Sequence, residues 1–192
     1  MQRSDARSQA SFAMAGFEYW PALITAQQIA EFCESIKGIP AERVTCGKKE
    51  ISWGEQRIPA STPLYDFFLS GEILGKVAHC MGKADARQPE LKCWTSIYKA
   101  GEHINPHKDG SGDVQLLLCL RAGESANGGR LVLEHGGRRS ELQLLPGDAV
   151  LFKATEVTHH TTPLLPSPSV PDPQRMVAVG RYYFQPRIKS AG

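Results

Sequence analysis

Residues that bind transition metals occur in a characteristic order in the second half of the sequence. His107 and Asp109 are two positions apart, and the pair His159-His160 follows about fifty residues later. In an extended segment, residues i and i+2 point to the same side and can converge on one metal ion. Two imidazoles and one carboxylate form the ligand set that holds non-haem Fe(II) and leaves positions open for chemistry. These residues are therefore candidate ligands of an iron site formed by His107, Asp109 and one histidine of the pair. The alternative for His107 and Asp109 is a solvated pair in a loop.

A zinc site is the alternative for one of these histidines. His103 and His107 are four residues apart, which is the spacing of two zinc ligands on a helix. Pro106 disfavours a helical conformation of the residue before it, and the glutamate of the H-E-x-x-H motif is missing. We therefore do not predict a zinc site, and we interpret His79 and His135 as structural or solvated residues.

Composition and charge indicate an ordinary globular protein. The chain has 192 residues, the length of about one domain, with 41% hydrophobic and 22% charged residues. The formal charge of +2 is small, and Lys and Arg are spread along the chain, so neither a nucleic-acid nor a membrane partner is indicated. The five cysteines include no C-x-x-C pair, which favours reduced thiols. Without a signal-peptide core we expect a cytoplasmic protein, and nothing indicates an oligomeric state.

The first part of the chain is predicted to be helical. Residues 1–15 are expected to form a disordered tail, and residues 16–90 a helical part that packs on a sheet. Thr25 and Gln28 form a capping box in front of apolar residues at helical spacing. Pro63 begins a second helical stretch, because proline is favoured at the first helical position.

The second part of the chain is predicted to consist of short strands. Glycine- and proline-containing turns separate them, at residues 127–129, 136–137 and 146–147. The expected strands span residues 94–98, 114–120, 130–135, 141–145, 148–153 and 175–184. An additional short strand is indicated by Ile51 and Trp53. Such a series predicts a mainly β fold, a sandwich or jelly roll, with the helices packed outside one sheet.

Taken together, these motifs resemble the Fe(II)- and 2-oxoglutarate-dependent dioxygenases, particularly the prolyl-hydroxylase-like branch. The resemblance covers residues 93–184, and its motifs are Tyr98-x-x-Gly101, His107-x-Asp109, Gly128-Gly129-x-Leu131, residues 146–152, and the region from His159 to the strand beginning at Arg175. It implies a double-stranded β-helix, a cupin-like jelly roll whose open end holds the metal. Residues 91–192 are accordingly expected to form the dioxygenase core, in one domain with the helical part.

The resemblance also implies which residues bind the metal and the cosubstrate. His107, Asp109 and His159 are the implied iron ligands. His159 is favoured over His160, because the family frame places a small or β-branched residue two positions later and a proline four positions later. Arg175 is implied to bind the distal carboxylate of 2-oxoglutarate.

The resemblance favours Arg175 because it lies five residues before Gly180 on the last strand, and the chemistry explains why an arginine is needed there. A guanidinium binds a carboxylate through two parallel hydrogen bonds, which lysine cannot do, and the Tyr98 hydroxyl is the expected second donor. Arg175 lies further from His159 than the corresponding residue of relatives. The proline-rich segment 163–174 accounts for this extra length, as a lid, a docking edge or a purely structural loop. Arg181 is the alternative anchor.

The implied reaction uses Fe(II), 2-oxoglutarate and O2, with ascorbate as a candidate reductant. It hydroxylates a C–H bond and releases succinate and CO2. Asp109 favours hydroxylation over halogenation, since related halogenases lack this carboxylate. The compact size favours a small molecule or free amino acid as substrate. The alternatives are a peptide or protein side chain, and a non-catalytic cupin-like jelly roll that binds a metal or ligand.

Overall fold

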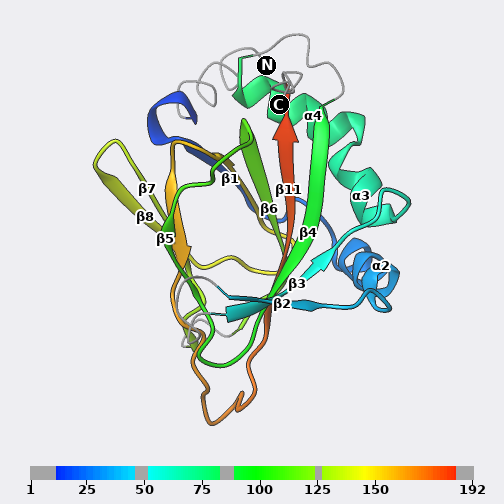
Figure 1. Cartoon of the computed structure of the whole chain (residues 1–192), viewed down its shortest axis with the longest axis vertical. Helices are drawn as coiled ribbons and strands as arrows, with labels where there is room; N and C mark the ends of the chain where they lie inside the picture. The colour runs from blue at the N-terminus through cyan, green and yellow to red at the C-terminus, as the bar shows by residue number, and fades with distance from the viewer. Residues whose placement is uncertain (1–11, 46–51, 83–88, 124–126, 185–192) are drawn as a thin grey trace, which may run out of the picture.

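Two antiparallel β-sheets lie across from each other, and the helices pack on the outer face of the larger sheet (Figure 1). The computed structural model describes residues 12–45, 52–82, 89–123 and 127–184. The larger sheet has the order β1 (Phe17–Trp20), β9 (Ala149–Lys153), β6 (Val114–Arg121), β11 (Arg175–Tyr183), β4 (Glu90–Tyr98), β3 (Ser52–Arg57) and β2 (Glu42–Thr45). The smaller sheet has the order β5 (Ile104–His107), β10 (Thr158–Thr161), β7 (Leu131–His135) and β8 (Arg138–Leu142). The predicted jelly roll is confirmed.

The helices are α2 (Ala26–Ile36), α3 (Pro63–Phe68) and α4 (Gly71–Cys80). The predicted capping box begins α2: the backbone N–H of Gln28 donates to the Thr25 hydroxyl, and the backbone N–H of Thr25 donates to Gln28 Oε1. Thr62 caps α3, and proline occupies its first turn as expected. None of the helices in the described part of the chain is long and apolar enough to span a membrane.

The two faces of the larger sheet belong to two hydrophobic cores. Leu116 and Leu118 of β6 pack in a core with the helices, whereas Leu117 and Cys119 pack between the two sheets. Successive side chains of a strand point to opposite faces. The unbroken apolar run in β6 is therefore explained by burial on both sides, and it makes β6 a rigid support for the space between the sheets.

The expected division at residue 90 differs from the structure in two places. The part predicted to be helical contains three strands, β1, β2 and β3, which extend both ends of the larger sheet. Trp53 lies in β3, as its short-strand signal indicated, and Ile51 lies outside the described residues. Residues 12–15 of the expected tail are helical, because Phe12, only 2% exposed, packs into the core. Residues 1–11 lie outside the described residues.

The described cysteines are free thiols, namely Cys33, Cys80, Cys93 and Cys119, and Cys46 lies outside the described residues. Burial raises the pKa of the Cys119 thiol to about 11, and it also raises the pKa of Cys93. Both thiols are therefore protonated near neutral pH and behave as small apolar core residues.

Candidate metal centre

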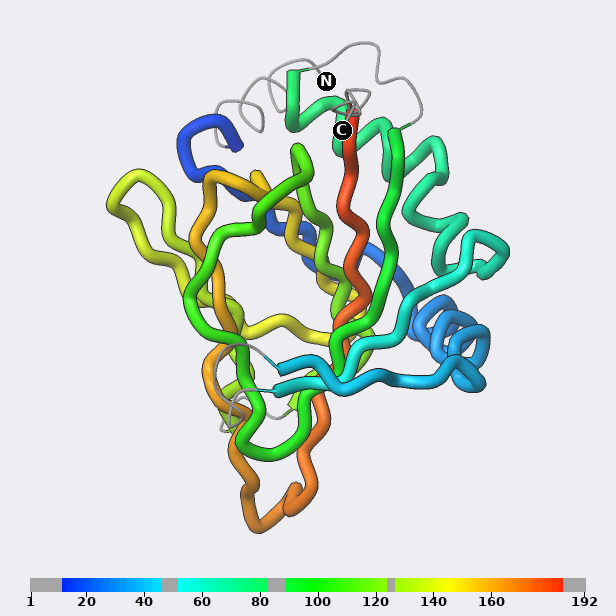
Figure 2. Tube along the Cα trace, in the orientation of Figure 1, coloured from blue at the N-terminus to red at the C-terminus, as the bar shows by residue number. Residues whose placement is uncertain are grey.

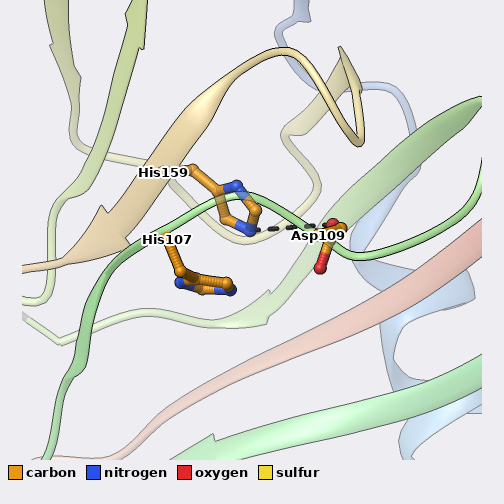
Figure 3. A group of neighbouring side chains, drawn as sticks. All are labelled: His107, Asp109 and His159. Carbon is orange, nitrogen blue, oxygen red and sulfur yellow. Dashed lines mark ion pairs between the residues drawn. The ribbon is translucent and has the colours of Figure 1, made fainter.

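The three predicted ligands lie together between the two sheets (Figure 3). Their ligand atoms are all within 4.8 Å of one another. His107 ends β5 and His159 lies directly opposite it on β10, so the strand pairing alone brings the two imidazoles together. Asp109 follows β5 by two residues, and its backbone N–H donates to the Ala154 carbonyl at 3.0 Å. The fixed backbone therefore aims the carboxylate at the histidines.

Backbone carbonyl groups hold both imidazoles in the tautomer that a metal requires. His107 Nδ1 lies 2.8 Å from the Asn105 carbonyl oxygen, and His159 Nδ1 lies 3.2 Å from that of Val157. A carbonyl oxygen only accepts, so each Nδ1 carries the proton and donates it. The Nε2 lone pairs are left free, as in metal-binding histidines whose other nitrogen is hydrogen-bonded to the protein.

His159 is held neutral by its surroundings. Burial is the main cause, and together with the nearby His107 it lowers the His159 pKa to about 3. A metal ligand must be an unprotonated imidazole. His159 is therefore ready to bind a metal without first losing a proton at any physiological pH.

Asp109 presents one free oxygen to the histidines. Oδ1 accepts a hydrogen bond from the Arg181 guanidinium. Oδ2 is buried 3.9 Å from His159 Nε2, and no hydrogen-bond donor among the described residues reaches it. Burial raises the Asp109 pKa, although Arg181 and His107 oppose the shift. A buried oxygen without a partner is costly, and a divalent cation between Oδ2 and the two Nε2 atoms would satisfy it. These residues thus fit an Fe(II) site.

Neither competing histidine belongs to the group of converging ligands, although His160 lines the same cavity. His160, the alternative third ligand, is outside the group of converging ligand atoms, since neighbouring residues of a strand point to opposite sides. His103 precedes β5, and the segment to His107 is extended instead of helical. The zinc spacing of a helix is therefore absent from this segment.

Arg175 lies in the same cavity as the metal ligands and forms no ion pair with any residue that the structure describes. The cavity has a volume of about 780 Å³ and is lined by both sheets. Arg175 is 3% exposed, and both terminal guanidinium nitrogens are buried without a hydrogen-bond partner among the described residues. Tyr98 is its cross-strand neighbour, and the guanidinium carbon lies 5.3 Å from the centre of that ring. A buried guanidinium with free donors suits an anionic ligand, since burying an unpaired charge is costly.

Arg181, the alternative anchor, already binds two side chains of the protein. Its guanidinium donates to Asp109 and to Gln115 Oε1, the latter at 2.8 Å. No motif of the sequence predicts this contact with a metal ligand. The spacing of six residues between Arg175 and Arg181 is even, which puts both side chains on one face of a strand. This spacing alone indicates that Arg181 could face the site as Arg175 does.

Gly128 and Gly129 have a structural role beside Arg175. Both have positive φ values, of 74° and 66°. A Cβ atom on Gly129 would lie 3.3 Å from Arg175 Cδ and 3.0 Å from Leu164 Cδ1. The glycine pair therefore allows the turn and leaves room for the arginine.

The proline-rich segment 163–174 extends away from the sheets next to the start of β11 (Figure 2). Its first residues are anchored: the Leu164 carbonyl accepts from the Gly101 N–H at 2.6 Å, and the Leu164 side chain is fully buried. The residues that line the cavity include none from this segment. Its position supports a role in anchoring the Arg175 end and gives no support to a lid.

Comparison with known proteins identifies the fold. No protein-family model and no curated protein matches the sequence. An oxidoreductase of the 2OG-Fe(II) oxygenase family from Burkholderia pseudomallei superposes with a TM-score of 0.78 at 16% identity, covering 96% of this chain and 93% of that one. A prolyl-4-hydroxylase from Pseudomonas putida gives 0.70 at 17% identity, with 95% and 100% covered. HygX from Streptomyces hygroscopicus, solved with nickel and 2-oxoglutarate and also with hygromycin B, gives 0.67 at 14%, with 95% and 87% covered. The chain has the fold of these oxygenases.

Proposed function

We propose that this protein is an Fe(II)- and 2-oxoglutarate-dependent oxygenase that hydroxylates a small molecule. The observation that carries the proposal is one cavity with two unsatisfied features: three converging ligand atoms that fit a metal, and a buried arginine that fits a carboxylate. The shared fold of the oxygenases described above supports it.

In this proposal His107, Asp109 and His159 hold the iron. Bound there together with 2-oxoglutarate and O2, iron supplies the oxidising chemistry that hydroxylates a C–H bond and forms succinate and CO2. These three side chains would supply only three ligands, so an iron ion held by them could also bind the cosubstrates. The hydrogen bonds to Asn105 and Val157 keep both imidazoles oriented.

Arg175 then binds the distal carboxylate of 2-oxoglutarate. Its two free terminal nitrogens match the two oxygens of a carboxylate. Tyr98 is the second donor: burial raises its pKa, so its hydroxyl stays protonated and can donate. Leu117, Leu131 and Val177 line the same cavity with apolar surface that keeps water from the bound cosubstrate.

The size of the cavity supports a small-molecule substrate. At about 780 Å³ it is within the range of roughly 300 to 1,000 Å³ of small-ligand pockets. A peptide side chain is the alternative, because the solved structures with this fold include a prolyl-4-hydroxylase as well as HygX. A panel of metabolites, free amino acids and peptides decides between them, scored by succinate release and by mass spectrometry for the gain of one oxygen.

The metal and cosubstrate sites are tested before any substrate is known. Anaerobic addition of Fe(II) and 2-oxoglutarate should give a visible charge-transfer band, and calorimetry with Ni(II) should show one site. His107→Ala and Asp109→Ala should lose both signals, whereas His160→Ala should retain them as the matched control. A colourless mixture would favour a non-catalytic metal- or ligand-binding protein, and a wild-type signal from Asp109→Ala would contradict the ligand assignment.

A further inference from the structure

Three cationic side chains line the cavity at the end away from Arg175. They are Arg57 at the end of β3, Lys92 near the start of β4 and Arg181 near the end of β11. Lys92 lies directly opposite Arg181, and Arg57 lies directly opposite Trp94, two residues along β4 from Lys92. The register therefore puts all three cations on one face of the sheet, around the Trp94 ring. Arg175 is six residues from Arg181 on β11, roughly 20 Å at the rise of a strand.

Arg181 is held rigidly within this group. Gln115 and Asp109 accept hydrogen bonds from it, and its guanidinium carbon lies 5.0 Å from the centre of the Trp94 ring. A guanidinium has five N–H donors, more than these two residues and the nearby Tyr183 hydroxyl can use. Donors therefore remain for a ligand beside Asp109.

The arrangement is unfavourable without an anion. Like charges directly opposite each other on paired strands destabilise a sheet, as in the pair Lys92 and Arg181. Among the described residues neither Arg57 nor Lys92 forms an ion pair, and the Lys92 ammonium lies over the Tyr183 ring, 5.6 Å from its centre. The cavity lining has four cations, including Arg175, against the carboxylates of Glu55 and Asp109.

Iron and 2-oxoglutarate would not remove this excess. Their charges, +2 and −2, cancel each other. The two carboxylates of 2-oxoglutarate would be used at the metal and at Arg175, at a distance from Arg57 and Lys92. An uncompensated positive end would therefore remain beside Asp109, on the side of the cavity away from Arg175.

We propose that Arg57, Lys92 and Arg181 form a subsite, floored by Trp94, that binds an anionic group of the substrate, a carboxylate or a phosphomonoester. This inference rests on the proposed function, because it needs 2-oxoglutarate to occupy the Arg175 end. Arg181 joins the two sites, since it contacts Asp109 and also faces the subsite. A substrate held there by its anion would lie beside Asp109, one of the three proposed metal ligands.

Calorimetry on protein loaded with Ni(II) and 2-oxoglutarate tests the subsite without turnover. Small carboxylic acids, including free amino acids, are titrated beside their primary amides, and phosphomonoesters beside their parent alcohols. The best binder should be an anion that binds at least about tenfold more tightly than its neutral partner. The carboxylate and phosphate arms show which anion the subsite selects.

Two single substitutions assign the binding to the subsite. Lys92→Met and Arg57→Met should each weaken the affinity for the best-binding anion by about threefold to fivefold, as expected for the loss of an exposed charge. The affinity for the corresponding amide or alcohol should change little. Lys76→Met, an exposed lysine on α4, is the matched control and should bind the anion as the wild type does.

The outcomes separate this inference from the proposed function. If Ni(II) and 2-oxoglutarate bind but amides or alcohols bind as well as the anions, the anionic subsite is wrong and the oxygenase proposal stands. Equal losses for anion and neutral partner in Lys92→Met would also overturn the subsite. If Ni(II) and 2-oxoglutarate do not bind, the proposed function itself fails first.

Discussion

Replacing Arg175 with methionine should have opposite effects on stability and on cosubstrate binding. The side chain is buried, and its terminal nitrogens have no partner among the described residues. An unpaired buried cation costs several kcal/mol, of which the contact with the Tyr98 ring recovers about 1 to 2 kcal/mol. Methionine fills a similar volume without the charge. The free energy of unfolding without ligand should therefore stay equal or rise by about 1 kcal/mol.

The same substitution should greatly weaken the binding of 2-oxoglutarate. Removing one partner of a buried, hydrogen-bonded charge pair costs about 2 to 4 kcal/mol, which is roughly 30-fold to 900-fold in Kd. Urea unfolding of the metal-free protein measures the first effect, and calorimetric titration of 2-oxoglutarate into Ni(II)-loaded protein measures the second. Arg175→Lys keeps the charge but not the two parallel hydrogen bonds, so its affinity should be intermediate.

Arg181→Met serves as the contrast for this experiment. It removes the hydrogen bonds to Asp109 and Gln115, so it should reduce metal affinity and lower the stability of the metal-free protein. The reasoning would be refuted if Arg175→Met destabilised the unliganded protein and left the affinity for 2-oxoglutarate unchanged. If only Arg181→Met lost the binding of 2-oxoglutarate, Arg181 and not Arg175 would be the residue that anchors the cosubstrate.

Three further perturbations test the surroundings of the site. The folded-state pKa of His159, about 3, lies below its unfolded value near 6.5, so the unfolded state binds a proton first as the pH falls. As the pH falls between these values, the free energy of unfolding of the metal-free protein should decrease by up to about 1.4 kcal/mol per pH unit. Urea unfolding should show a smaller slope for His159→Gln. Gly129→Ala should cost about 1 to 2 kcal/mol and weaken 2-oxoglutarate in calorimetry, because its φ is positive and its Cβ would crowd Arg175. Asp148→Ala should cost about 3 kcal/mol in urea unfolding and leave Ni(II) affinity unchanged, since Asp148 accepts from the Tyr19 hydroxyl and from two backbone N–H groups.

Local patterns explain which parts of the fold were predictable. The turns at Gly136-Gly137 and Pro146-Gly147 separate strands near the expected positions, since turn residues act over a few neighbours. β1 was missed, because Phe17–Trp20 is a short edge strand whose conformation depends on pairing with β9, more than a hundred residues away. The helical residues 12–15 were missed for the same reason, since one buried phenylalanine holds them.

The residues of the candidate site also differ in whether local sequence patterns could predict them. The proximity of His107 and Asp109 follows from a spacing of two residues, and the resemblance to known enzymes directed attention to His159 and Arg175. The partner of Arg181 did not follow from sequence. Asp109 lies 72 positions before it, and the contact depends on the register of two strands together with the turn after β5.

The two arginines of β11 show how pairing assigns function to identical side chains. Both point into one cavity from one face of one strand. Arg181 is bound to Asp109 Oδ1, and this leaves Oδ2 as the only oxygen free for a metal. Arg175 has no such partner among the described residues, so its terminal nitrogens are available to a bound ligand. A metal and a dicarboxylate would together satisfy Asp109 Oδ2 and the Arg175 guanidinium. The positive charge beside Trp94 would then be left for the anionic group of the proposed substrate.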